Sequence, residues 1–492
     1  MKSYSVCAFL IFICCVHISC SISAQNQALS LNKELILPIE YQSLNNDSFD
    51  HRSLKPITQK ELKDSLYLAY LSIQKVDRSF VSRKLFHEHL IQYDSGGVQF
   101  TIDPLLNLEL GRELADDPRD INLYKNMRGF MLRLNLGEKV SIESSFRENQ
   151  ANLPYYLSLR TRRNNVAYGQ GRVKSFEEGY DFNMASSRIT YTPTDYLNIQ
   201  LGHDKHFIGN GERSLLLSDL SFNYPFIRLQ SDWLNGKLKY QNLFTLFQDI
   251  ERLPGDGLSE SLFSRKQGVF HHLSFSPNTV FNVGLFEGMI FPSLDSSGNV
   301  GVPASYWVPL MYLNSSTSGS KRNGNTLLGL DWSLELFKKV LLYGQGSLFD
   351  ERISNLSLQA GAKWFIYDDL SIQVEHNKQL FDKNENLFMH YSESINTPIL
   401  SEHDEYLVGL NWQRKRILAK IQANYIETDF EEIKTVNGSL SYMVNPASSL
   451  KYSLGYLHRE SENKSNQQSI QPISSYFYFS LSTSLQNLYF NY

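Results

Sequence analysis

Apolar and polar residues alternate along most of this chain from residue 97 onward. In the first clear segment, Val98, Phe100 and Ile102 alternate with Gln99 and Thr101. Successive side chains of a β-strand point to opposite faces, so the alternation predicts strands with one apolar and one polar face. The same period recurs within 106–110, 130–136, 140–146, 197–201, 238–246, 269–275, 281–285, 356–366, 370–374, 406–412 and 450–456.

The number and spacing of these segments predict one continuous barrel rather than several domains. Turn residues such as Asp368-Asp369 and Asn445-Pro446 separate neighbouring segments. At roughly 20 to 25 residues for a strand and its connection, residues 97–492 supply about 18 strands. The predicted fold class is therefore all-β: a transmembrane, antiparallel outer-membrane β-barrel.

The C-terminus carries the same alternation. Leu488, Phe490 and Tyr492 occupy every second position within 484–492, and the chain ends on an aromatic residue. Aromatic residues form girdles at the membrane interfaces of outer-membrane barrels. We therefore expect residues 484–492 to form the strand that closes the barrel.

Residues 1–24 have the features of a signal peptide. Met1-Lys2 is basic, 6–18 is apolar, and Ile22-Ser23-Ala24 provides small residues before Gln25. This predicts export and, with the strands, a location in the outer membrane of a gram-negative bacterium. A lipoprotein is the alternative, but Cys20 follows His17-Ile18-Ser19 and not the aliphatic and small residues that lipidation requires.

Residues 25–96 form a separate N-terminal region. The stretch 25–53 is rich in Asn, Ser and Gln and is expected to be an extended arm. Thr58 and Glu61 then have capping-box spacing before apolar residues at helical spacing: Leu62, Leu66, Ala69, Tyr70 and Ile73. This predicts a short helix that is a periplasmic foot, a plug of the barrel, or a simple link to the first strand.

Composition excludes several classes of protein. All four cysteines (Cys7, Cys14, Cys15 and Cys20) lie in the predicted signal peptide, so the mature chain has no thiol for a disulfide, a metal site or catalysis. The chain contains 28 Tyr and 30 Phe, yet its mean hydropathy is only −0.32. Alternating lipid-facing and water-facing residues give this average. A net charge of −4 offers no basic surface for nucleic acid, and no cofactor or metal is expected.

Five long connections are expected at 148–183, 209–225, 249–266, 292–323 and 382–404. The first contains a cluster of basic and aromatic residues: Arg160, Arg162, Arg163, Arg172 and Lys174 with Tyr155, Tyr156 and Tyr168. Guanidinium groups bind carboxylates with two parallel hydrogen bonds, and aromatic faces can stack on sugar rings. The cluster therefore suits an acidic polysaccharide; alternatively it only solvates the loop or pairs with lipopolysaccharide phosphates.

The segment 202–219 concentrates glycines and both signs of charge. Its notable residues are His203, Asp204, His206, Gly209, Gly211, Arg213 and Asp219. The glycines permit tight turns, so a structural role in a folded loop at the rim or in the lumen is favoured over a polysaccharide contact. A metal site is disfavoured because residues 203 and 206 of a strand point to opposite faces.

Other histidines and enzyme motifs add little. His271 and His272 are adjacent, so on a strand they face opposite sides, whereas His87 and His89 could share a face as an interfacial pair. The chain has no Gly-x-Ser-x-Gly elbow, His-Glu-x-x-His helix or phosphate loop. A hydrolase that uses an unmarked Ser and His from facing strands is the remaining enzymatic alternative.

Three short patterns resemble the Wzi-type capsule-assembly outer-membrane proteins. They are the 202–219 segment, the lead-in 83–91 with Phe100-Thr101-Ile102-Asp103-Pro104, and Gly284-Leu285-Phe286-Glu287. They are most similar to the gliding-motility-associated branch that includes RemB. The resemblance implies an 18-stranded barrel, occluded by helices at the periplasmic side, that organises surface polysaccharide or takes part in gliding without catalysis.

Three functions are therefore expected, in order of preference. The first is a barrel that binds, retains or helps assemble surface polysaccharide. The second is a gliding or secretion-linked surface component, and the third is a diffusive pore. The expected partners are outer-membrane lipid, lipopolysaccharide, surface polysaccharide and, for the second function, the gliding or secretion machinery.

Overall fold

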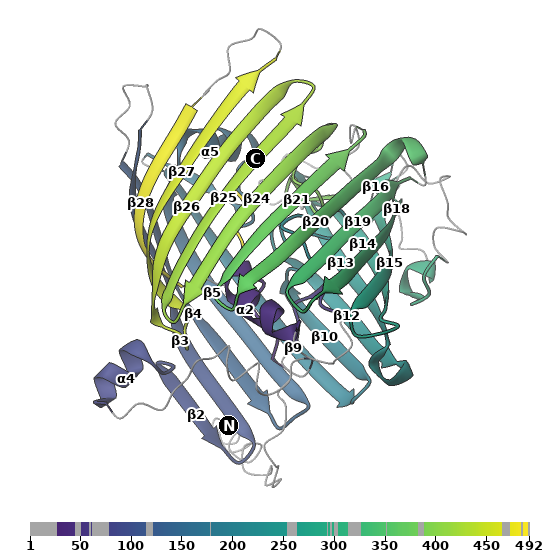
Figure 1. Ribbon diagram of the computed structural model, residues 1–492, viewed down its shortest axis with the longest axis horizontal. Coiled ribbons are helices and arrows are strands. Elements are labelled where there is room, and N and C mark those ends of the chain that lie inside the picture. The colour runs from purple at the N-terminus through teal and green to yellow at the C-terminus, as the bar shows by residue number, and fades with distance from the viewer. Residues whose placement is uncertain are drawn as a thin grey trace, which may run out of the picture.

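Eighteen long antiparallel strands close into a barrel in the computed structural model of this protein (Figure 1). The structure describes residues 27–44, 51–58, 61, 78–114, 122–177, 179–252, 263–292, 294–295, 298–299, 304–312, 326–350, 352–381, 388–464, 473–483 and 486–490. The predicted fold class and strand number are confirmed. Residues 1–24 lie outside the described residues, as does the predicted helix after Glu61.

The barrel strands follow one another around the wall in chain order. They are β3 Val98–Glu113, β4 Asn122–Leu136, β5 Val140–Asn152, β9 Gly179–Thr194, β10 Leu197–Asp204, β12 Tyr224–Trp233, β13 Leu238–Arg252, β14 Phe263–Phe275, β15 Phe281–Pro292, β18 Thr326–Leu336, β19 Val340–Phe349, β20 Leu356–Tyr367, β21 Leu370–Gln379, β24 His403–Arg414, β25 Ile417–Thr428, β26 Glu431–Asn445, β27 Leu450–Asn463 and β28 Ile473–Thr483.

Shorter elements lie before, between or against these strands. The short strands are β1 Leu54–Lys55, β2 Ile91–Ser95, β6 Val166–Ala167, β7 Gly171–Arg172, β8 Lys174–Phe176, β11 Phe207–Ile208, β16 Leu294–Asp295, β17 Gly298–Asn299, β22 Met389–His390 and β23 Glu393–Ser394. The helices are α2 Lys33–Ser43, α4 Phe80–Phe86 and α5 Tyr155–Asn164, with 3-10 turns η2 Leu234–Gly236, η3 Ala304–Trp307 and η4 Ile353–Asn355. No helix of the described part is both long and apolar enough to cross a membrane.

The barrel closes between β28 and β3, not through the last residues of the chain. Ser482 pairs with Asn107 and Tyr476 with Glu113, while β2 pairs with the first part of β3. The prediction that residues 484–492 form the closing strand is wrong. Residues 486–490 form no strand and enter the lumen, where hydrogen bonds hold them, so their alternation has another cause.

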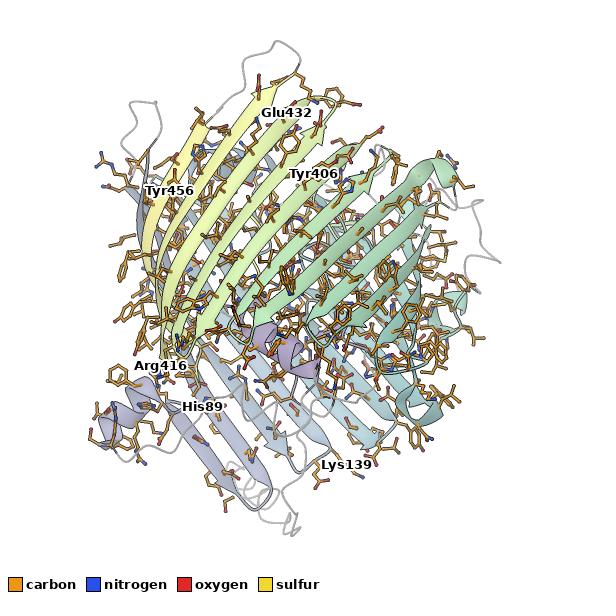
Figure 2. The ribbon with its side chains drawn as sticks, viewed as in Figure 1. His89, Lys139, Tyr406, Arg416, Glu432 and Tyr456 are labelled. Atoms are coloured by element: carbon orange, nitrogen blue, oxygen red, sulfur yellow. The ribbon has the colours of Figure 1, made fainter. Side chains whose placement is uncertain are left out.

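The two faces of each strand differ as the alternation predicts, and β21 is a clear example. Ser371, Gln373 and Glu375 point inward and are buried, whereas Val374 between them points outward and is 45% exposed. The outward face of the barrel is apolar and aromatic, as Tyr406 and Tyr456 illustrate (Figure 2). The inward face is polar, and much of it is buried, so other parts of the chain must fill the lumen.

The barrel has a short-turn end and a loop end. Turns of a few residues, such as the one that contains Lys139, join strands at one end, and the expected long connections all lie at the other, where Figure 2 places Glu432. Outer-membrane barrels carry their short turns on the periplasmic side. The expected loop positions are confirmed to within a few residues.

Helix α4 projects sideways from the short-turn end of the barrel (Figure 1). Arg416 donates to the carbonyl of Phe86 at 3.1 Å and to His87 Nδ1 at 3.0 Å, which fixes the end of the helix to a strand turn. His89 instead bonds Asp103 of β3 at 2.6 Å. His87 and His89 therefore have separate partners and do not form a pair.

The segment 304–312 covers the outer surface of β13 to β15, where the alternation breaks down. His271 and Asn242 point outward and share a 2.6 Å hydrogen bond, and Glu287 beside them accepts from the amide of Tyr312 at 2.6 Å. Tyr240 donates to the carbonyl of Pro309. This part of the connection shields polar groups that would otherwise face lipid.

We expect a charge on the outward face to destabilise the barrel. Leu454 on β27 is 59% exposed beside Leu440 and Phe479. Leu454→Arg should lower the folding free energy in lipid vesicles by about 2 to 4 kcal/mol if the site lies near the bilayer midplane. Urea titration followed by heat-modifiable gel migration measures this, with Leu454→Phe as the control. Equal midpoints for the two variants would contradict the placement of Leu454 toward lipid.

Candidate functional site in the filled lumen

Several segments that are distant in the sequence fill the lumen. They are the N-terminal residues 27–44, which include α2, and 51–58, the β10–β12 connection 205–223, the part of the β21–β24 connection at 388–402, and the C-terminal residues 486–490. Strand β1 pairs with β11, so the N-terminal arm joins the β10–β12 connection. Leu54, Ile208 and Leu217 pack with Phe388 and Ile395 in one apolar cluster inside the barrel.

A buried ion pair fixes the β10–β12 connection to the barrel wall. Arg213 donates to Glu405 of β24, with a shortest distance of 2.7 Å, and both side chains are only 1% exposed. The backbone amides of Glu212 and Arg213 donate to Glu375 of β21 at 2.6 and 3.0 Å. The chain thus crosses the lumen and is anchored on two neighbouring strands.

The glycines of this connection lie where the backbone approaches the wall. A Cβ atom at Gly211 would overlap the carboxylate of Glu375, and Gly209 has a φ of 144°. Only glycine adopts such a φ at little cost. These positions explain why the connection contains glycines beside its charged residues.

Helix α2 crosses the lumen despite containing Pro38, and it corrects the expectation of an extended arm. The side chain of Asn32 caps the helix by accepting from the amide of Leu35 at 3.2 Å. Leu37 and Tyr41 pack against Phe365 of the wall. Tertiary packing therefore outweighs the weak helix propensity of this stretch.

The polar side of α2 is tied to the wall by ion pairs. Glu40 is 4% exposed and contacts Lys363 of β20 at 2.6 Å and Lys55 at 3.2 Å. Burial alone would raise the pKa of Glu40, but Lys363, Lys55 and Arg52 outweigh burial and lower this pKa to about 2. Glu40 is therefore ionised at all physiological pH values.

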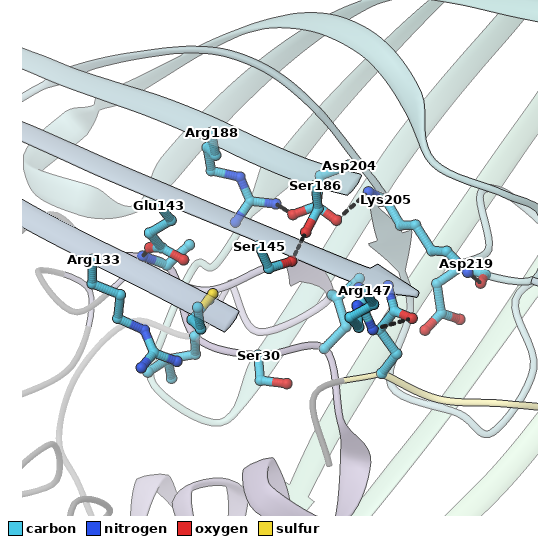
Figure 3. A pocket seen from close by; sticks show the side chains of 15 residues that line it. Ser30, Arg133, Glu143, Ser145, Arg147, Ser186, Arg188, Asp204, Lys205 and Asp219 are labelled. Carbon is cyan, nitrogen blue, oxygen red and sulfur yellow. Dashed lines mark hydrogen bonds and ion pairs between the residues drawn. The ribbon is translucent and has the colours of Figure 1, made fainter. Parts of the chain in front are cut away.

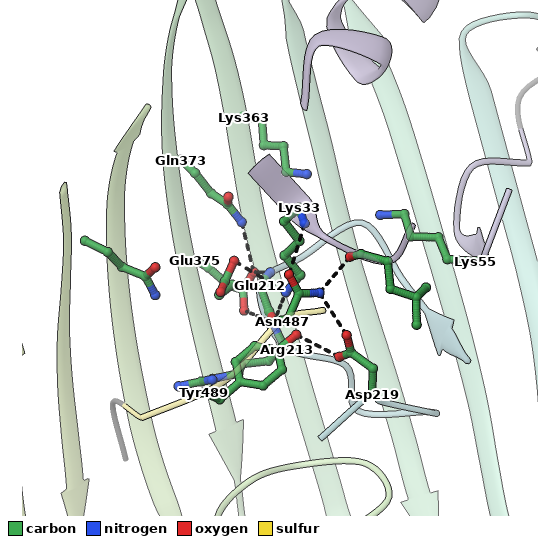
Figure 4. A network of polar contacts seen from close by, with 12 residues as sticks. Lys33, Lys55, Glu212, Arg213, Asp219, Lys363, Gln373, Glu375, Asn487 and Tyr489 are labelled. Carbon is green, nitrogen blue, oxygen red and sulfur yellow. Dashed lines mark hydrogen bonds and ion pairs between the residues drawn. The ribbon is translucent and has the colours of Figure 1, made fainter. Parts of the chain in front are cut away.

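The C-terminal residues are bound to the same interior (Figure 4). Tyr489 donates to Asp219 at 2.7 Å, and Asn487 donates to Asp219 at 2.8 Å and to the carbonyl of Leu31 at 2.7 Å. The amide of Lys33 donates back to Asn487. Asp219 thus joins the β10–β12 connection to the C-terminal segment, and Asn487 joins that segment to the N-terminal arm.

The histidines of the 202–219 segment do not come together. Strand β10 ends at Asp204, so His203 is on the strand and His206 lies beyond it. His203 bonds the carbonyl of Ala185, whereas buried His206 packs edge-on against Phe226. Burial, then Arg228 and Arg188, lower the pKa of His206 well below its usual range. Within the described residues, no group of three or more His, Cys, Asp or Glu side chains is placed to hold a metal ion.

Asp204 instead lines a small cavity between the wall and the N-terminal arm (Figure 3). Arg188 of β9 donates to Asp204 at 3.0 Å, and Arg147 on the neighbouring strand β5 donates to Gln486 of the C-terminal segment at 3.0 Å. The cavity has a volume of about 60 Å³. Its paired charges suit a structural role.

Helix α5 carries the predicted arginine cluster to the loop end of the barrel (Figure 1). Arg162 and Arg163 are exposed in its last turn, and exposed Arg172 follows on β7. Arg160 is instead half-buried, with its guanidinium 4.6 Å from the centroid of the Tyr168 ring. The structure thus brings three of the four arginines to the surface.

The two tyrosines of the cluster differ in exposure. Tyr156 is 6% exposed and donates to the carbonyl of Phe490 at 2.8 Å, while Tyr155 is half-buried. The loop is held below by Lys205, which donates to the carbonyl of Gly169 at 2.8 Å, and by Glu393, which accepts from the Gly169 amide at 2.6 Å. The plug therefore positions the arginine-rich surface.

The sequence analysis did not identify the residues that hold the plug. Glu375, Glu405 and Lys363 were unremarkable polar positions between strand residues. Their alternation with outward Val374 and Tyr406 was the available signal, because a charge on the inward face of a barrel needs a partner in the lumen. Nothing in the sequence indicated that the partners would be Arg213 and Glu40.

Comparison with solved structures places the fold among outer-membrane barrels. Wzi of Escherichia coli, described as an outer-membrane protein involved in group 1 capsule assembly and a carbohydrate-binding β-barrel, matches with a TM-score of 0.56 and 13% identity over 93% of this chain and 100% of that chain. This chain has a Wzi-like outer-membrane β-barrel fold. At this identity the likeness shows the fold alone.

Weaker matches include two further barrels. OccK3 (OpdO) of Pseudomonas aeruginosa matches with a TM-score of 0.43 and 10% identity over 77% of this chain and 95% of that chain. OccAB2 of Acinetobacter baumannii matches with a TM-score of 0.45 and 10% identity over 77% and 97%. No family model and no curated protein sequence matches the chain. The resemblance to the gliding-associated branch stays a prediction.

We expect the Arg213–Glu405 pair to control the stability of the plug. Arg213→Met leaves a buried carboxylate without its cation and should cost about 3 to 5 kcal/mol. Adding Glu405→Gln should restore part of this loss, because the charge is then removed with its partner. The urea midpoint for protease cleavage within residues 205–223 measures both effects. A double variant as unstable as Arg213→Met would contradict the assigned pairing.

We also expect acid to loosen α2. The pKa of Glu40 is about 2 in the folded chain, against 4.5 for the same side chain when the protein is unfolded. The stabilisation from its ion pairs is present above pH 4.5 and is lost as the pH falls through 2. The melting temperature from near-ultraviolet circular dichroism should fall over this range, and less steeply in Glu40→Gln. Parallel profiles for the two proteins would disprove the contribution of Glu40.

Proposed function

We propose that this protein is a non-enzymatic outer-membrane barrel that binds, retains or helps assemble an acidic surface polysaccharide. The observation that carries the proposal is the surface formed by Arg162, Arg163 and Arg172 at the loop end, above a filled lumen. Signal-peptide removal after residue 24 would deliver the chain to the outer membrane, with the short turns in the periplasm.

The arginine surface is suited to a polyanion. The side chains of Arg162 and Arg163 form no hydrogen bond or ion pair with any residue that the structure describes, so their guanidinium groups are available. Each guanidinium can bind a carboxylate through two parallel hydrogen bonds. Arg172 lies with its guanidinium 4.5 Å from the centroid of the Phe263 ring, which orients it at the surface. The carbohydrate-binding description of Wzi is in keeping with this role.

The filled lumen argues against a diffusive pore. Arg213 and Glu405 are fully buried where a channel would run, and α2 with the C-terminal segment occupies the same interior. A stable plug held by ion pairs on β20, β21 and β24 leaves the outer surface of the loops as the place for a large ligand. The expected lipopolysaccharide contact is the competing explanation for the arginines.

We expect replacement of the surface arginines to weaken binding of acidic polymer. The triple variant Arg162→Ala, Arg163→Ala and Arg172→Ala should bind polygalacturonate at least ten-fold more weakly and with less dependence on salt. The matched control replaces Lys339, Arg414 and Lys415 with Ala, because these exposed cations lie at the short-turn end. Biolayer interferometry on detergent-purified barrel measures both variants.

The same triple variant distinguishes the competing roles in cells. Increased shedding of surface polysaccharide at unchanged total synthesis supports retention or assembly. Weaker binding of lipopolysaccharide vesicles with unchanged polygalacturonate binding would assign the arginines to lipid phosphates and overturn the proposal. Loss of motility with the surface coat intact would favour the gliding or secretion-linked role.

A further inference from the structure

A second, larger cavity lies inside the barrel beneath α5. It has a volume of about 260 Å³ and lies against the inner wall formed by β25 to β28, β3 and β4, with residues 488–490 of the C-terminal segment at its side. Pockets for drug-sized ligands begin at roughly 300 Å³. The space therefore suits a group of the size of one sugar ring.

Two tyrosines form an aromatic surface on the wall of this cavity. Tyr476 and Tyr478 follow one another on the inward face of β28. The neighbouring strands place glycines beside them: a Cβ atom at Gly111 of β3 would overlap the Tyr476 ring, and one at Gly455 of β27 would overlap the Tyr478 ring. The rings lie across these glycines and stack on each other, with centroids 5.3 Å apart and planes at 25°.

This arrangement has a chemical consequence. The Tyr478 ring, which lies along the wall over Gly455, turns one face toward the interior, whereas Tyr476 is only 5% exposed within the cluster that includes Tyr156 and Leu157. The C–H face of a pyranose is apolar and packs on such a surface, as apolar groups do on aromatic rings generally. Gly455 therefore allows Tyr478 to act as a platform for a flat sugar ring.

Polar side chains line the same wall as the tyrosines, on the strands two and three positions away from β28. Lys420 and Gln422 of β25 and Asn437 and Ser439 of β26 line the cavity. Within the described residues, Lys420, Asn437 and Ser439 make no side-chain hydrogen bond or ion pair. They are donors and acceptors that hydroxyl groups of a sugar could engage.

One ammonium group that lines the cavity has no ion-pair partner among the described residues. Glu109 pairs with Lys125 at 2.7 Å, Glu212 pairs with Lys33 at 3.4 Å, and Glu34 pairs with Lys451. Lys420 has no such partner, although it is near enough to help lower the pKa values of Glu34 and Glu212 against the effect of burial. A ligand with one carboxylate would balance it.

We propose that this lumenal cavity binds one hexuronate residue of an acidic saccharide. The ring stacks on Tyr478, the carboxylate pairs with Lys420, and the hydroxyls bond Asn437 and Ser439. The ligand class rests on the proposed function, but the site is separate from the surface arginines. Tyr156 of α5 donates a hydrogen bond to Phe490 at the cavity and so connects the arginine-bearing loop with the lumenal site.

The test uses short saccharides, of which one residue would occupy the cavity. Calorimetry on the full barrel in detergent compares trigalacturonate with neutral maltotriose. We expect saturable binding of trigalacturonate, at least ten-fold tighter than that of maltotriose. Ser439→Trp fills the cavity and should abolish binding, whereas Leu440→Trp, on the outward face of the same strand and 53% exposed in the native chain, should leave it unchanged.

Heat-modifiable gel migration shows whether Ser439→Trp folds. Two further variants test the proposal if it does not. Tyr478→Ala should weaken trigalacturonate binding ten-fold. Lys420→Met should remove the preference for trigalacturonate over maltotriose. Absence of saturable trigalacturonate binding to the native barrel, or equal binding by native protein and both variants, overturns the proposal.

The surface-arginine variant separates this inference from the proposed function. It should keep trigalacturonate binding while it loses polygalacturonate binding. Trigalacturonate binding that depends on Lys420, together with polymer binding that is unaffected by the arginines, would refute the surface site and leave the lumenal site standing. Loss of both ligands in the arginine variant would show one surface site and refute the lumenal one.

Discussion

The closed sheet imposes one constraint on the rest of this structure: whatever the strands turn inward must be paired inside the barrel. Outward residues such as Val374 and Leu454 meet lipid, and their inward neighbours are polar or charged. A buried charge without a partner is costly, so Glu375 and Glu405 each require donors. The β10–β12 connection supplies them through its own amides and the Arg213 guanidinium.

The described N-terminal and C-terminal segments meet in the lumen for the same reason. The N-terminal arm and the C-terminal segment exchange hydrogen bonds through Lys33 and Asn487, and both contact the β10–β12 connection. The three segments form one plug rather than three independent loops. Because β28 is complete at Thr483, the C-terminal segment can enter the lumen without opening the sheet.

This plug relates the interior to the outer surface. Lys205 and Glu393 hold the loop that carries α5, and Tyr156 of α5 reaches the C-terminal segment at Phe490. A ligand bound by the exposed arginines would therefore lie above an ordered base and not above open solvent. The cavity beneath α5 is bordered by the same contacts, so the proposed surface and lumenal sites share their support.

The sequence by itself determined the wall of the barrel. Alternation in strands such as β3, β21 and β27 gave the fold class, the strand number and the loop end, because side-chain direction in a strand depends only on position.

The alternation misassigned residues 484–492, since it cannot distinguish a strand from an extended segment that packs inside a barrel. It also missed α2, where Pro38 weakens the helical pattern. The arginines of α5 were found as a cluster, but only tertiary packing left Arg160 half-buried and Arg162 exposed. The pairing of Arg213 with Glu405, of Glu40 with Lys363 and of Asp219 with Tyr489 was decided by the closed barrel, because it brings residues together that have no relation in sequence spacing.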